Sequence, residues 1–165
     1  LSSAVGRTQI KRYNERMQEI QRAMNPFWDL LEGVPGIVPH RTPADGDSTM
    51  GGWYAAKGIY APEQLGGLPV ARFCEAVSFR ILPGANPLMH LHPVLNDADI
   101  YGHGKPTRIA HSDRDLRQRE GSLPVTESMP ERIYSIPWFK HYDEKIIAQY
   151  AAAFRKVVEH AEELL

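Results

Sequence analysis

The chain has 165 residues, which is enough for one ordinary domain and too few for two large ones. Apolar residues make up 42% and charged residues 24%, a composition typical of a folded chain. The net charge of −1 lacks the basic surplus of a dedicated nucleic-acid binder, and no apolar run reaches the roughly 18 residues of a membrane span. The single cysteine, Cys74, excludes an internal disulfide and a multi-cysteine zinc site. We therefore expect a cytoplasmic protein with no nucleic-acid or membrane partner.

The first residues, Leu1-Ser2-Ser3-Ala4, include no methionine and no basic segment followed by an apolar one. They therefore do not have the pattern of a signal peptide. We expect the chain to be part of a longer protein.

The first 32 residues predict a long amphipathic helix. Asn25-Pro26 predicts a kink in this helix or the start of a new one, and Gly33 followed by Pro35 predicts its end. The apolar residues that alternate by three and four along one face are Ile10, Tyr13, Met17, Ile20, Met24, Phe27 and Leu31.

The last 23 residues predict a second amphipathic helix, with Asp143 as its N-cap. Charged residues occupy the face opposite the apolar one. Two apolar faces of this kind are most simply buried against a shared sheet or against each other. The apolar face consists of Ile147, Tyr150, Phe154, Val157, Ala161 and Leu164.

All 13 prolines lie between Pro26 and Pro137, so the middle of the chain must consist of short elements separated by turns. Together with the two helices, this predicts an α+β fold with a small mixed or antiparallel sheet and the C-terminal helix packed on it. Strands are expected at Gly36–Arg41, Gly52–Tyr60, Val77–Leu82 and Tyr134–Pro137, a short helix at Pro69–Ala76, and loops at Asp45–Ser48 and Asn96–Glu120.

His90 and His92 are the first candidates for chemistry, because alternate residues of a strand point the same way and two imidazoles can share a metal ion. With Gly84 they resemble the first half of a cupin metal motif. Asn96 stands where that motif has a glutamate, and Pro93 interrupts the strand directly after the second histidine. The other interpretation is a structural or substrate-facing pair of histidines.

The remaining motifs do not combine into a complete active site. Gly102–Lys105 hints at a phosphate loop, but Asp99 replaces a required glycine and Pro106 replaces the Ser or Thr, so we expect a flexible turn. Cys74 is expected to be a buried, inert thiol, and no G-x-S-x-G nucleophile motif occurs. None of the six lysines has the companions of a Schiff-base lysine.

Several segments form a pattern through their order and spacing: Leu1–Ile10 (L-S-S-A-V-G-R-T-Q-I), Asn14–Arg16 (N-E-R), Leu30–Ile37 (L-L-E-G-V-P-G-I), Pro87–His92 (P-L-M-H-L-H), Leu123–Glu127 (L-P-V-T-E) and Ile133–Pro137 (I-Y-S-I-P). They resemble the segments L-Q-A-A-L-G-x-x-Q-L, N-E-R-R, L-L-x-x-x-P-G-I, P-L-H, C-P-x-A-E and x-L-S-L-P of the DegT/StrS family. Members of that family are pyridoxal-phosphate-dependent aminotransferases, and many act on nucleotide-linked keto-sugars.

The resemblance covers the family's C-terminal part and implies the type I aminotransferase fold. Residues 1–33 would be the helix that links the cofactor domain to the small domain, and residues 34–165 the small α+β domain. The family's cofactor lysine, ring-nitrogen aspartate and phosphate-binding residues precede this part. The resemblance therefore implies that this chain has no catalytic residue and does not bind pyridoxal phosphate covalently, so that alone it would be inactive.

The resemblance also implies partners and site residues. The partners are a second copy of the chain in a homodimer, the upstream cofactor domain, an amino-acid donor such as glutamate, and a keto-sugar or related ketone as acceptor. His90 is the position that the resemblance places on the substrate side, with His92, Asn96 and Tyr101 as neighbours. Leu123 stands where the family has cysteine, which leaves the identity of the acceptor open.

Two other classes of function remain open. One is a cupin-like, metal-dependent small-molecule binder or dioxygenase that uses His90 and His92. The other is a helical scaffold that dimerises through the apolar face of Ile10–Leu31.

Overall fold

The computed structural model describes residues 2–42, 46–47 and 53–165 of the chain. The chain divides into two compact units. Unit 1 comprises Leu1–Pro83 and Glu131–Leu165, and unit 2 comprises Gly84–Pro130. The predicted linking helix of residues 1–33 and the sheet therefore fall in the same unit. Among the described residues, no helix combines the length and the apolar character needed to cross a membrane.

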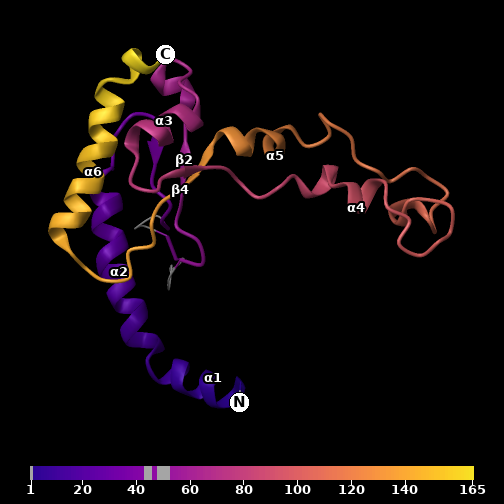
Figure 1. Ribbon diagram of the computed structural model, residues 1–165, viewed down its shortest axis with the longest axis horizontal. Coiled ribbons are helices and arrows are strands. Elements are labelled where there is room, and N and C mark those ends of the chain that lie inside the picture. The colour runs from indigo at the N-terminus through magenta and orange to yellow at the C-terminus, as the bar shows by residue number, and fades with distance from the viewer. Residues whose placement is uncertain (1, 43–45, 48–52) are drawn as a thin grey trace. The chain divides into compact units, whose positions relative to one another are not determined.

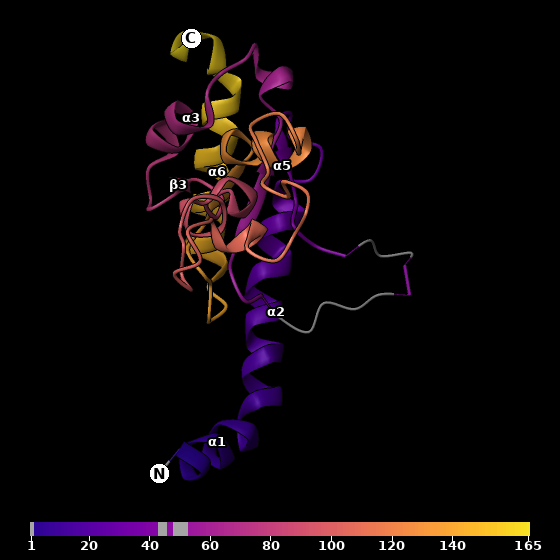
Figure 2. The ribbon, with the colours of Figure 1, turned by 90° about the vertical axis from the view of Figure 1, so that its right-hand side faces the viewer.

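The N-terminal helical region consists of two helices, α1 (Ser2–Lys11) and α2 (Tyr13–Leu30), which meet at Arg12 (Figures 1 and 2). The prediction of one continuous helix was wrong at this point. No residue of α1 is buried, so no packing holds α1 in line with α2. Pro26 lies inside α2 and does not begin a new helix. Gly33 follows the helix with a φ of 71°, a conformation that favours glycine at a helix end.

Only the C-terminal part of the predicted apolar face is buried. Ile20, Met24 and Phe27 are buried, whereas Ile10 and Tyr13 are 77% and 57% exposed. The helical period by itself identified the face correctly, but it could not show how far along the helix the partner elements reach.

The C-terminal helix, α6 (Glu144–Glu159), begins as predicted. The side chain of Asp143 accepts a hydrogen bond of 3.0 Å from the Ile146 N–H, which satisfies one of the free donors of the first turn. Along α6, Ile147, Ala151 and Phe154 are buried. The helix packs beside α2 (Figures 1 and 2), and a short 3₁₀ helix, η5 (Ala161–Leu164), follows it.

The sheet of unit 1 has the order β1-β2-β4-β3, and each neighbouring pair is antiparallel. This confirms the predicted α+β fold with a small antiparallel sheet of short strands. The strands are shorter than predicted. Gly52 of the predicted second strand, and Asp45 and Ser48 of the predicted loop Asp45–Ser48, lie outside the described residues. The strands are β1 (Ile37–Val38), β2 (Lys57–Tyr60), β3 (Leu82–Pro83) and β4 (Ile133–Ser135).

The predicted strand Val77–Leu82 was wrong over most of its length. The short helix α3 (Val70–Val77) extends through Val77, and only Leu82 belongs to a strand. Between them Ser78, Phe79 and Arg80 have φ values of 62°, 49° and 61°, which non-glycine residues rarely adopt. Each residue of this kind costs on the order of 1 kcal/mol. The apolar run Val77–Leu82 thus contains a sharp reversal that hydropathy does not reveal.

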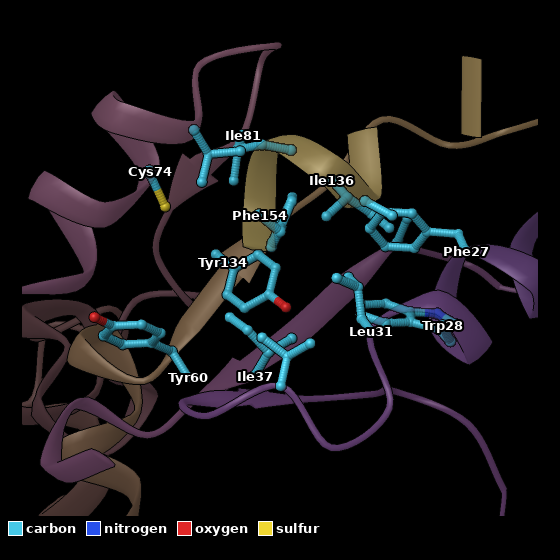
Figure 3. Close-up of a cluster of buried hydrophobic side chains, with 14 of the residues drawn as sticks. Phe27, Trp28, Leu31, Ile37, Tyr60, Cys74, Ile81, Tyr134, Ile136 and Phe154 are labelled. Carbon is cyan, nitrogen blue, oxygen red and sulfur yellow. The ribbon is translucent and has the colours of Figure 1, made fainter. Parts of the chain in front are cut away.

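The core of unit 1 forms where α2, α3 and α6 cover one face of the sheet. The Phe154 ring contacts Phe27, Phe73 and Tyr134 with centroid distances of 5.7, 5.6 and 5.7 Å. Figure 3 shows Tyr134 of β4 between Phe154 of α6 and Ile37 of β1. The ring of Phe154 thus connects α6 to α2, to α3 and to the sheet, because it fills the space between them.

Unit 2 is built from short helical segments joined by irregular chain, and none of its residues, all of which are described, forms a strand. The predicted loop Asn96–Glu120 is confirmed as irregular apart from one 3₁₀ turn, Thr107–Ile109, and Asn96 itself, which ends a helix. The segments are η2 (Met89–Leu91), α4 (Pro93–Asn96), η3 (Thr107–Ile109) and α5 (Pro124–Ser128). The remaining 3₁₀ helices are η1 (Pro62–Leu65) in unit 1 and η4 (Met129–Glu131) at the junction of the units.

Candidate functional site

The centre of unit 2 is polar. Among its described side chains only His90 and Asn96 are buried, and no apolar side chain is. The sequence of Gly84–Pro130 contains no phenylalanine and no tryptophan, and its one tyrosine, Tyr101, is exposed, so no large ring fills the interior of unit 2 as in unit 1. Buried polar groups are costly unless they are hydrogen-bonded, so the hydrogen bonds of these two residues contribute to the stability of unit 2.

His90 is bonded to Glu127 across 37 residues. The imidazole Nε2 lies 2.9 Å from the Glu127 Oε1. The same carboxylate accepts hydrogen bonds from the backbone N–H of Leu123 (3.0 Å) and Gly121 (2.7 Å). These hydrogen bonds lower the pKa of Glu127. The bond from the Leu123 N–H has the largest effect, followed by those from Gly121 and His90. An ionised carboxylate only accepts hydrogen bonds, so Nε2–H of His90 is the donor in this contact.

Asn96 completes this polar centre, which we define as His90, Asn96 and Glu127. Its Nδ2 donates to the His90 carbonyl at 2.7 Å, and its Oδ1 accepts from the Gln118 N–H at 3.3 Å. The side chain of Asn96 therefore joins the start of unit 2 to the end of its long irregular segment. The polar centre holds three separate stretches of chain together without an apolar core.

His92 occupies a different position from the one expected. The two histidines do not lie on a strand: His90 belongs to η2, and His92 is the N-cap of α4, where its Nδ1 accepts from the Val94 N–H at 3.2 Å. The alternation that would point both imidazoles the same way is therefore absent. Among the described residues no group of three or more His, Cys, Asp or Glu side chains is arranged to bind a metal ion.

Tyr101 lies on an exposed turn and is 66% exposed. In this turn the Asp99 carboxylate accepts hydrogen bonds from the backbone N–H of His103 (2.9 Å) and Gly104 (2.7 Å), and the first of these bonds contributes most to lowering the Asp99 pKa. These are the kind of backbone N–H groups that hold phosphate in a phosphate-binding loop. Here a carboxylate of the same segment takes them, which confirms a turn and disfavours a phosphate site.

Neither Cys74 nor any lysine lies in a reactive environment. Cys74 is buried as expected, and burial raises the pKa of its thiol to about 12. Lys57, the one half-buried lysine, donates from Nζ to the Ser135 hydroxyl at 2.8 Å, and the other five lysines are exposed. No lysine is therefore desolvated in the way that an imine-forming lysine requires.

The structure brings together three of the four predicted substrate residues, because the Asn96 side chain donates to the backbone carbonyls of His90 (2.7 Å) and His92 (3.4 Å). Tyr101 instead lies near the His103 ring, with the centroids 6.1 Å apart. Sequence reasoning missed Glu127 as a member of the site. The signal was its position four residues after Leu123 in L-P-V-T-E, where proline starts a helix and an acidic side chain can bond back to the preceding N–H groups.

Comparison with known proteins finds no protein-family model that matches the chain and no match among curated proteins.

Proposed function

We propose that the chain is the small C-terminal domain of a pyridoxal-phosphate-dependent aminotransferase that resembles the DegT/StrS family. In this proposal the intact protein transfers an amino group from an amino-acid donor to a ketone carbon of a keto-sugar or related acceptor. The present chain forms one wall of the acceptor pocket and part of a homodimer interface, and the cofactor is held by an upstream domain of the same protein.

One observation carries the proposal: the hydrogen bond between His90 and Glu127. The two residues belong to Pro87–His92 and Leu123–Glu127, which are two of the segments on which the resemblance rests. Short motifs of this kind are weakly specific when each is considered alone. A direct bond between them gives a physical reason why both are present in one chain.

The N-terminal helices offer a second support. Ile10 and Tyr13 are 77% and 57% exposed at the end of α1 and the start of α2, whereas the predicted apolar face to which they belong is buried farther along α2. In the proposed protein this part of the face packs against the cofactor domain or the partner subunit. Apolar side chains that continue a buried face are typical of an interface.

The residues of this chain do not fit a covalently held cofactor. The five exposed lysines lack the burial that a pyridoxal-phosphate lysine requires, and the Nζ of the half-buried Lys57 donates to the Ser135 hydroxyl. We therefore assign no chemical step to this chain. Its proposed contribution is to position the acceptor and to exclude water from the site.

The first test uses the protein as the cell makes it, captured with an antibody against this chain. Its intact mass should exceed that of the 165 residues, and borohydride reduction should fix pyridoxal phosphate on one lysine outside them. Reduction of the isolated chain in the presence of pyridoxal phosphate should leave no stoichiometric adduct. A stable adduct on one lysine within the chain would contradict the proposal.

A second test separates the acceptor side from the donor side. In the captured protein, His90→Ala should raise the KM for the acceptor by about tenfold, because the residue is placed on the acceptor wall. The half-reaction with the amino-acid donor should stay unchanged. His141→Ala, an exposed histidine of unit 1, is the matched control. If both variants changed the acceptor KM equally, the placement of His90 on the acceptor wall would be wrong.

A further inference from the structure

A pocket of about 470 Å³ lies in unit 1 and shares no lining residue with the polar centre. It is formed where α3 ends and α6 passes into η5, two regions that lie side by side in Figure 1. Its volume falls in the range of about 300–1,000 Å³ that is typical of small-molecule sites. The apolar residues of its lining include Val77, Phe79, Val157 and Leu164, and its charged side chains include Lys156 and Glu163.

An unusual backbone conformation supplies one wall. Ser78, Phe79 and Arg80 all have positive φ, although none is glycine. Hydrogen bonds from the Ser78 N–H to the Cys74 carbonyl (3.0 Å) and from the Ile81 N–H to the Ser78 carbonyl (2.9 Å) hold this turn. Non-glycine residues in this conformation occur preferentially at binding and active sites.

The turn places an aromatic ring at the pocket. Phe79 lies against Tyr150 of α6, with ring centroids 4.9 Å apart, and still remains 48% exposed. Its ring is therefore held in place while part of it stays open to a ligand. The other walls include the aliphatic side chains of Val77, Val157 and Leu164. This combination suits a flat apolar group that can pack on a ring.

The charged groups of the pocket favour an anion. Among the described residues, no carboxylate forms an ion pair with Lys156. The acidic residue of the lining, Glu163, is instead bonded to His160, with Nδ1 2.8 Å from Oε1. An ammonium group beside apolar walls and without a carboxylate partner attracts a negatively charged ligand group.

We propose that this pocket binds a small aromatic anion, a molecule with one planar ring system and one carboxylate or sulfonate group. The ring system packs on Phe79 and the aliphatic walls, and the anionic group pairs with Lys156. Binding joins the turn after α3 to α6 and so stabilises unit 1. The proposal does not depend on the aminotransferase function, because the pocket and the polar centre share no residue.

The test uses 8-anilinonaphthalene-1-sulfonate as the probe, with fluorescence titration of the whole 165-residue chain. We expect one saturable site. Ala153→Met narrows the pocket and should weaken binding about tenfold, whereas Ala152→Met, on the neighbouring exposed position outside the lining, should not. The probe should also raise the unfolding temperature of the wild type more than that of Ala153→Met, a measurement made only on variants whose circular dichroism matches the wild type.

The charge of the ligand is tested separately. Lys156→Met should weaken binding of the sulfonate probe about fivefold. Binding of the neutral analogue N-phenyl-1-naphthylamine should stay unchanged, because only the sulfonate probe carries a charge. Lys145→Met, on the same helix but outside the lining, is the control. Non-saturable binding, or equal affinities of Ala153→Met and Ala152→Met, would overturn the site. Equal effects of the two lysine variants would overturn the assignment of an anion.

Discussion

Units 1 and 2 are held together by different interactions. Unit 1 contains all five phenylalanines and all three tryptophans of the chain, and its core is a cluster of rings around Phe154. In unit 2 the two buried residues among the described side chains are His90 and Asn96. Apolar burial is the dominant favourable contribution to folding, whereas each hydrogen bond contributes only about 0.5–1.5 kcal/mol net. We therefore expect unit 1 to be the more stable and unit 2 to depend on a few polar groups.

The largest effect is expected from Phe154→Ala in unit 1. The change removes a fully buried ring that contacts α2, α3 and the sheet, and it should lower the free energy of unfolding by about 3–5 kcal/mol. Urea unfolding followed by tryptophan fluorescence measures it, because every tryptophan lies in unit 1. Ile146→Ala, a 46% exposed position on the same helix, is the control. Similar losses for both variants would argue against a core centred on Phe154.

Two glycines test the packing of unit 1 with the same chemical change. A Cβ at Gly58 would overlap the Tyr134 ring, so Gly58→Ala should cost about 1–3 kcal/mol. A Cβ at Gly6 in α1 would meet nothing, so Gly6→Ala should instead stabilise the helix by up to about 1 kcal/mol. Thermal unfolding of both variants measures the difference. Shifts of the same sign would contradict the close packing of β2 against Tyr134.

Unit 2 should become less stable when the side-chain amide of Asn96 is removed. Asn96→Ala leaves the His90 carbonyl and the Gln118 N–H without their partner, which should cost about 1–3 kcal/mol. Amide hydrogen exchange within Gly84–Pro130 should accelerate, while the tryptophan-detected unfolding of unit 1 stays unchanged. Asn14→Ala, an exposed position of α2, is the matched control. Equal acceleration in both units would show that the two units do not fold independently.

Acid should weaken unit 2 through Glu127. Its pKa is lowered in the folded state, so the ionised form stabilises the fold. This contribution is fully present above the ordinary pKa of about 4.3 and is lost as the pH falls through the lowered folded value. Hydrogen exchange in unit 2, corrected for the intrinsic pH dependence, should show that loss. Glu127→Gln keeps similar geometry but does not titrate, so its protection should change less over this range.

Local signals in the sequence were sufficient for several elements. The period of the apolar residues identified the buried faces of α2 and α6, and Asp143 and Gly33 marked a helix start and a helix end. Each of these signals acts within one or two turns of chain, so no distant contact is needed to interpret it. The strand ends were less predictable, because a strand ends where its partner ends.

The sequence did not show the bond between His90 and Glu127, which lie far apart in the chain, or the sharp turn after α3. His90 and Glu127 are separated by 37 positions, and neither local pattern indicates the other. The turn at Ser78–Arg80 likewise interrupts a run of residues that hydropathy assigned to one strand.

The sequence by itself determined the fold class, the two amphipathic helices and the absence of phenylalanine and tryptophan from residues 84–130, because composition and period are properties of the chain. The tertiary structure alone decided which part of each apolar face is buried, and that the Glu127 carboxylate is bonded to His90. The physical reason is that burial and hydrogen bonding depend on which groups meet in space, and only folding brings those groups together.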